Sequence, residues 1–131
     1  MALSKEDRDV MVKLHIEKSH GFLNNADTYF GNGDLSTSAN RYYYACFHAI
    51  HALFVANGII TKSHDGLNAQ FNLNFIKKNI LDKRFGAFVA RMENIRNKAD
   101  YDVLFSVSEE DLTNIKPLAH QLIKSIEEIL S

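Results

Sequence analysis

The sequence predicts an all-α fold, an antiparallel four-helix bundle with an additional short helix. Apolar residues recur every three or four positions over several helix-length segments, and no segment alternates as a strand would. The chain of 131 residues holds one proline and six glycines, which leaves room for long helices and argues against a many-turned β-sandwich. Its length is that of one domain, so residues 1–131 are expected to form a single helical domain.

The first two helices are predicted over about residues 4–30 and 34–56. Ser4 is a suitable N-cap for the first helix, and either Asp34 or Ser36 can cap the second. Apolar residues on the second segment follow one another at spacings of three and four, which predicts a buried face. This face comprises Ala39, Tyr42, Tyr43, Cys46, Phe47, Ile50, Leu53 and Phe54.

Three further helices are predicted over about residues 64–79, 83–100 and 109–130. The first of these is the short one. The last begins after Ser108, which has an acidic residue three positions on, as in a capping box. Pro117 lies inside that segment, but the apolar period continues through it, so we expect a kink and not a break.

Composition excludes several classes of protein. The chain carries 15 basic and 16 acidic residues, a net charge of −1, so any contact with nucleic acid has to come from a local patch. The single Cys46 excludes an internal disulfide and a cysteine-based zinc site. The polar start and the lack of a long apolar run predict a cytoplasmic protein with no membrane span.

Arg96 does not fit the pattern of its helix. On a helical projection it lies between Val89 and Met92, in the middle of the apolar arc of residues 83–100. A guanidinium cannot lose its charge, so it needs a partner there. One interpretation is an ion pair with Asp100, one turn further on. The other is an anion-binding arginine at a cleft or subunit interface, and the two can coexist.

A polar and aromatic stripe lies on the second helix, apart from its apolar face. Arg41, Tyr44, His48 and His51 fall within about a quarter turn at ~100° per residue. Two histidines one turn apart can share a metal, but no carboxylate shares the stripe, so we expect no metal or cofactor. A surface or interface stripe is the simpler interpretation. His64, at the start of the short helix, is expected to cap it or to serve its loop.

Three segments resemble signatures of bacterial HEPN-domain proteins. Residues 41–49, RYYYACFHA, are similar to the R-x-Y-Y-A-x-F-H-A signature of the family. Residues 62–66, KSHDG, are similar to its K-x-H-x-G loop, and residues 96–101, RNKADY, to its R-x-x-A-D-Y segment. The three segments occur in the family's order, across most of the chain from about residue 34 to 105.

The resemblance implies a small helical bundle that forms a two-fold dimer. Many HEPN proteins are toxins of toxin–antitoxin pairs, with a minimal nucleotidyltransferase as the antitoxin. Active members are metal-independent endoribonucleases with an R-x(4–6)-H motif at the dimer cleft. In that chemistry the arginine binds the scissile phosphate, and the histidine moves protons between the ribose 2′-hydroxyl and the leaving oxygen. An older proposal for the superfamily is simple nucleotide binding.

By this resemblance Arg96 is the arginine of the motif, with Asp100 orienting it. Tyr101 stands where the motif has histidine, and it would share proton transfer with a histidine from elsewhere in the chain. The RNA- or nucleotide-binding residues would be Arg41, Tyr44, His48, His51, Lys62, His64 and Asn97.

Three hypotheses follow from the sequence. The first is a HEPN-type toxin, a metal-independent endoribonuclease at a dimer cleft. The second is a non-catalytic HEPN module that binds nucleotide or a nucleotidyltransferase partner, which the replacement of the motif histidine favours. The third is a purely structural bundle in which Arg96 and Asp100 form a core ion pair.

Overall fold

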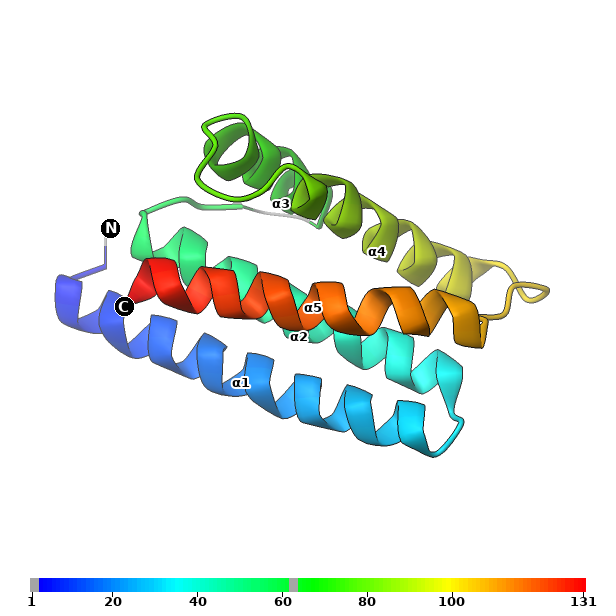
Figure 1. The fold of residues 1–131 in the computed structure, drawn as a ribbon. Coiled ribbons are helices and arrows are strands. Elements are labelled where there is room, and N and C mark those ends of the chain that lie inside the picture. The colour runs from blue at the N-terminus through cyan, green and yellow to red at the C-terminus, as the bar shows by residue number, and fades with distance from the viewer. Residues whose placement is uncertain (1–2, 62–63) are drawn as a thin grey trace.

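The computed structural model describes residues 3–61 and 64–131, leaving out the side chains of His64, Asp65 and Asp100. Its described residues form helices and no strand, which confirms the all-α prediction. The elements, in chain order, are α1 (Lys5–Gly31), α2 (Leu35–Ala56), α3 (His64–Phe71), the π-helix η1 (Asn72–Ile76), α4 (Arg84–Tyr101) and α5 (Glu109–Leu130) (Figure 1).

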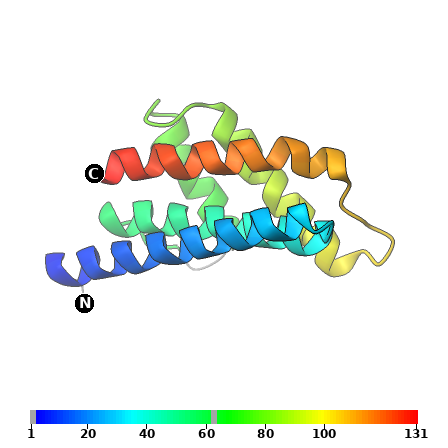
Figure 2. The ribbon, with the colours of Figure 1, turned by 60° about the horizontal axis from the view of Figure 1, so that its bottom comes forward.

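The four long helices run alternately up and down, with α2 at the centre. In Figure 1, α5 lies in front of α2, while α1 and α4 flank α2 on opposite sides. Helix α2 packs against all three of these neighbours. Both views place the start of α1 and the end of α5 at the same end of the bundle (Figures 1 and 2). No helix among the described residues is long and apolar enough to cross a membrane.

The core confirms the predicted apolar face of α2. All of its residues are buried except Phe47, which is half-buried. Cys46 is only 3% exposed, and burial raises the pKa of its thiol to about 12. The thiol therefore stays protonated and contributes packing, not a nucleophile.

The helix ends also follow the predicted capping residues. The Ser4 hydroxyl accepts a hydrogen bond from the backbone N–H of Asp7 at 3.0 Å, and the Asp34 carboxylate accepts one from a backbone N–H three residues on. Ser108 and Asp111 form a full capping box: the Asp111 N–H donates to the Ser108 hydroxyl at 3.0 Å, and the Ser108 N–H donates to the Asp111 carboxylate at 3.1 Å.

The predicted short helix is divided in two. It begins as α3, but the N–H of Lys77 bonds to the carbonyl of Asn72 at 2.9 Å, an i to i+5 bond that widens the turn into η1. Asn79, with φ 59°, then ends the segment in the left-handed conformation that asparagine tolerates. Helical periodicity alone does not distinguish these two kinds of turn.

The close approach of η1 to α4 requires glycine at position 86. A Cβ there would lie 2.5 Å from the Asn72 side-chain oxygen and 3.4 Å from Ile76. We therefore expect Gly86→Ala to lower the free energy of unfolding by about 1–2 kcal/mol, because overpacking outweighs the better helix propensity of alanine. Gly21→Ala on α1 is the matched control, since a Cβ there meets open space and should stabilise the helix slightly. Equal urea midpoints for the two variants would contradict this expectation.

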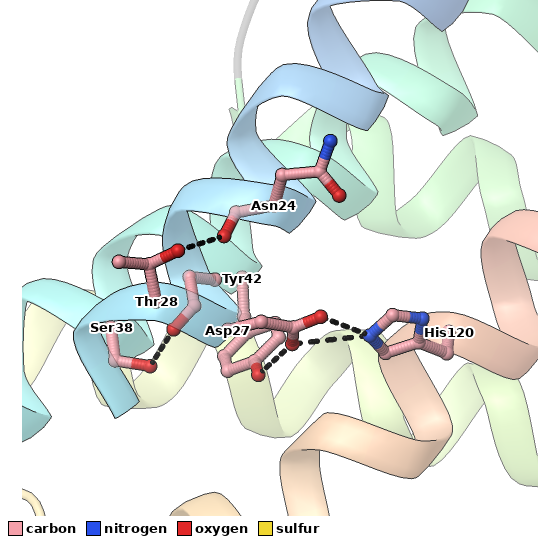
Figure 3. Close-up of polar contacts among 7 residues, drawn as sticks. Asn24, Asp27, Thr28, Ser38, Tyr42 and His120 are labelled. Carbon is pink, nitrogen blue, oxygen red and sulfur yellow. Dashed lines mark hydrogen bonds and ion pairs between the residues drawn. The ribbon is translucent and has the colours of Figure 1, made fainter. Parts of the chain in front are cut away.

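A polar network joins α1, α2 and α5, with the side chains of Asp27 and His120 partly exposed (Figure 3). The hydroxyl of Tyr42, a fully buried residue, donates a hydrogen bond to Asp27. The ring of His120, on α5, places Nε2 2.9 Å and 3.1 Å from the two oxygens of the same carboxylate. Burial and the neighbouring carboxylate raise the pKa of Tyr42 well above its ordinary value, so the phenol stays neutral and acts as the donor.

Candidate functional site

Arg96 lies half-buried on α4, where its guanidinium meets two aromatic rings of α2. Its Cζ atom is 5.2 Å from the ring centre of Tyr43 and 5.9 Å from that of Tyr44. Burial raises the pKa of Tyr43 to about 12, although the charge of Arg96 acts in the opposite direction. Aromatic faces attract the guanidinium while leaving its charge intact, which explains how an arginine is held on an apolar arc.

The hollow beside Arg96 is small. It measures about 20 Å³, room for about one water molecule, and Asn40, Ile95 and Val107 are among the residues that line it. An anion as large as a phosphate therefore has to meet the guanidinium from the open side of the α2–α4 seam. The expected ion pair with Asp100 stays a prediction, because that side chain lies outside the described part of the structure.

The predicted polar stripe of α2 follows the seam between α2 and α1. The Arg41 guanidinium lies over the ring of Tyr29, 5.9 Å from its centre. Further along, Phe22 of α1 lies 5.8 Å from the ring of Tyr44 and stacks on His48 at 5.5 Å. Tyr44 thus contacts both Phe22 of α1 and Arg96 of α4. The structure therefore brings together Tyr44 and Arg96, two of the site residues that the sequence predicted.

His15 adds a third imidazole to this stripe, which the sequence did not predict. Its Nδ1 atom lies 3.0 Å from Nδ1 of His48, and its ring stacks on His51 with 5.5 Å between centres. Nothing in the local sequence distinguishes His15, and only the packing of α1 on α2 reveals its neighbours. No group of three or more His, Cys, Asp or Glu within the described ranges is arranged to hold a metal ion.

Two imidazoles of this cluster, His48 and His15, have lowered pKa values and are uncharged at neutral pH. Burial lowers the pKa of His48 to about 4, with the neighbouring His15, Lys18 and His51 acting in the same direction. Burial and Lys18 also lower the pKa of His15. One of the two facing Nδ1 atoms, of His15 or of His48, therefore carries a hydrogen and donates a hydrogen bond to the other, as neutral imidazoles do.

This lowered pKa predicts a stability that depends on pH. The unfolded chain binds a proton at position 48 below about pH 6.5, whereas the folded chain resists it until about pH 4. The contribution of His48 to the free energy of unfolding is therefore fully present above pH 6.5, and it is lost as the pH falls from there towards 4. We expect a loss of about 1–2 kcal/mol, smaller than the full shift implies because the ring is half-exposed. His48→Phe should flatten the pH profile of the urea midpoint, and parallel profiles for the two proteins would contradict this origin.

The remaining predicted residues do not gather around Arg96 within the described part of one chain. Tyr101 is the last residue of α4 and is 87% exposed, and Asn97 is exposed on the same helix. Lys62 lies outside the described residues, as does the side chain of His64. Their roles in binding or catalysis stay predictions.

Comparison with known proteins identifies the family. Residues 12–129 match the model of the HEPN domain. A "UPF0332 protein" of Thermotoga maritima is 28% identical over 124 residues, covering 95% of this chain and 94% of the relative. A Methanocaldococcus jannaschii protein named "Putative toxin" is 29% identical over 131 residues, covering 98% of this chain and 97% of its own. A second protein of that organism with the same description is 26% identical over 115 residues, covering 88% and 78% of the two chains. The chain therefore belongs to the HEPN domain family.

Proposed function

We propose that this HEPN chain is the toxin of a toxin–antitoxin pair and cleaves RNA without a metal, at a cleft between two copies. The observation that carries the proposal is Arg96, a charged and half-buried residue held against the rings of Tyr43 and Tyr44. Two relatives that share most of its length have names that include the word toxin.

The proposed reaction uses the RNA's own nucleophile. Arg96 binds the scissile phosphate and stabilises the charge that develops on its oxygens. The ribose 2′-hydroxyl attacks phosphorus and gives up its proton, the bond to the 5′-oxygen breaks, and that oxygen takes up a proton. The products are a 2′,3′-cyclic phosphate and a 5′-hydroxyl, so no water or metal-bound oxygen is consumed.

Two copies are part of this proposal because of Tyr101. Its phenol is 87% exposed at the end of α4, so proton donation to a buried site within the same chain is not its role. Across a two-fold axis, the phenol of one copy can face the Arg96 seam of the other. His48 and His51 lie further along α2 from Tyr44, on the same stripe.

Growth of a bacterial host that expresses the chain tests the toxin proposal. The wild-type protein is expected to arrest growth, whereas Arg96→Ala, produced to the same level, is expected to be harmless. Arrest by both proteins would show that toxicity does not depend on the proposed phosphate site.

Tyr101 also favours a second candidate function, a non-catalytic module that binds nucleotide or a nucleotidyltransferase partner. A phenol is a poor general base at neutral pH, so the motif without its histidine has no efficient group to take the proton from the ribose 2′-hydroxyl. Calorimetry with mononucleotides and short RNA tests this candidate. Binding of either without any turnover supports the module, and turnover of RNA contradicts it.

A further inference from the structure

An apolar hollow beside the α2 stripe lies at one end of the bundle. It measures about 320 Å³ and is formed by the start of α1, the end of α2 and the segment that follows α2. Met11, Val55 and Ile59 give it apolar walls, while Arg8, His51 and Thr61 supply polar groups. Sites of this size with a few polar groups on apolar walls are typical of small-ligand pockets.

Arg8 gives this hollow a positive charge. The residue is half-buried, and no carboxylate among the described residues forms an ion pair with its guanidinium. Its planar fork of donors suits a ligand that offers two acceptor atoms side by side. Guanine offers such a pair in O6 and N7, and arginine is its commonest specific partner.

The hollow is aligned with the Arg96 seam along one face of α2. Tyr44, which contacts Arg96, lies on the same face as His48, His51 and Val55, at spacings of three and four. Tyr44 and Val55 are eleven residues apart, which is about 16 Å along the helix axis. A stacked strand advances about 3.4 Å per nucleotide, so at most about five nucleotides span this distance.

The surface between the two points suits a single strand of RNA. The ring of Phe47 contacts those of Tyr44 and His48, and all three are half-buried. Phe22 of α1 already packs on Tyr44 and His48, so a base can meet only the parts of these rings that Phe22 leaves exposed. Aromatic and imidazole rings accept stacked bases of any sequence. Lys18 lies close enough to His15 and His48 to lower their pKa, and so adds a positive charge near these two residues.

We propose that the hollow lined by Arg8 and His51 is a nucleobase subsite that selects guanine a few nucleotides from the phosphate bound at Arg96. The subsite rests on the proposed function, because it assumes that RNA lies along this face of α2. The subsite would supply sequence specificity, which Arg96 alone cannot: the bound guanine would determine which phosphate of the RNA lies at Arg96.

Fluorescence anisotropy with 2′-O-methyl RNA tests the subsite, since the methyl group removes the nucleophile and prevents cleavage. The probes are a hexanucleotide of alternating guanosine and uridine, a hexauridylate and a guanosine–uridine dinucleotide. We expect the wild-type chain to bind the guanosine-containing hexanucleotide about tenfold more tightly than hexauridylate. The dinucleotide, too short to reach from Arg96 to the hollow, is expected to bind at least tenfold more weakly than the guanosine-containing hexanucleotide.

Two variants separate the charge of the subsite from its space. Arg8→Gln removes the guanidinium, and Val55→Phe fills the hollow without changing charge. Each is expected to bring the two hexanucleotides to within about twofold of each other. Arg84→Gln, at an exposed arginine beside Asp82, is the matched control and should leave the tenfold preference intact.

The outcomes distinguish the subsite from the proposed function. A guanosine preference that persists in both Arg8→Gln and Val55→Phe would overturn the subsite, while leaving the role of Arg96 standing. Arg96→Gln is expected to weaken both hexanucleotides alike. If it weakens neither, the proposed function fails at Arg96, even if the Arg8 preference is present. Lack of binding to any probe would overturn both proposals.

Discussion

Replacing Arg96 with alanine is expected to lower the rate of RNA cleavage at least about 100-fold, the size of effect seen when one stabilising donor is removed from a reacting centre. The guanidinium is a positive charge that α4 presents to the rings of Tyr43 and Tyr44. Alanine suits the helix and removes this charge together with its contact with the two rings. The free energy of unfolding should therefore change by only about 1 kcal/mol.

Single-turnover cleavage of a labelled RNA measures this effect. Arg91→Ala is the matched control, because Arg91 is on the same helix but forms a surface pair with Asp111 at 3.2 Å. Its cleavage rate should match the wild type. The cleavage rate of Arg96→Lys should lie between those of Arg96→Ala and Arg91→Ala, since lysine keeps the charge but not the two-pronged geometry of a guanidinium. Equal rates for wild type and Arg96→Ala would remove Arg96 from the reaction.

Replacing Asp27 with alanine is expected to have the largest effect on stability, a loss of about 2–3 kcal/mol. The carboxylate accepts hydrogen bonds from Tyr42 and from His120, and so connects three helices. Without it, the buried Tyr42 hydroxyl keeps its desolvation cost and loses its charged acceptor, and only its weaker hydrogen bond with Ser38 remains. The Asp27→Asn variant should recover part of the lost stability, because the amide oxygen can still accept the Tyr42 hydrogen bond, although more weakly.

Urea denaturation of four proteins tests this network. The set comprises the wild type, Asp27→Ala, Tyr42→Phe and the double variant. Tyr42→Phe should lower the free energy of unfolding less in the Asp27→Ala background than in the wild type. In that background the phenol has already lost its acceptor Asp27, so removing its hydroxyl breaks no hydrogen bond with the carboxylate. Asp9→Ala, at an exposed position on the same helix, should change stability by less than about 0.5 kcal/mol. Strictly additive losses at Asp27 and Tyr42 would contradict a coupled network.

The elements of the fold could be predicted because their signals are local. The apolar period of α2 and the capping residues Ser4, Asp34 and Ser108 each act within a few positions of the chain. The change from α3 to η1 could not be predicted, since it lies in the backbone hydrogen bonding, as at Lys77, while the apolar spacing is the same on both sides.

The candidate site was predictable only in part. Arg96 stood out because a charge on an apolar arc needs a partner, and the stripe from Arg41 to His51 stood out because its spacing matches one helix face. What lies against them depends on contacts between distant segments. His15 meets His48 across 33 positions and His120 meets Asp27 across 93, and no local pattern encodes such pairs.

The chemical ends of the RNA products formed in EDTA test the central claim most directly. If Arg96 supports attack by the ribose 2′-hydroxyl without a metal, mass spectrometry should find 2′,3′-cyclic phosphates and 5′-hydroxyls, and Arg96→Ala should yield neither. Products with 5′-phosphate ends that appear only when a divalent metal is added would contradict the account.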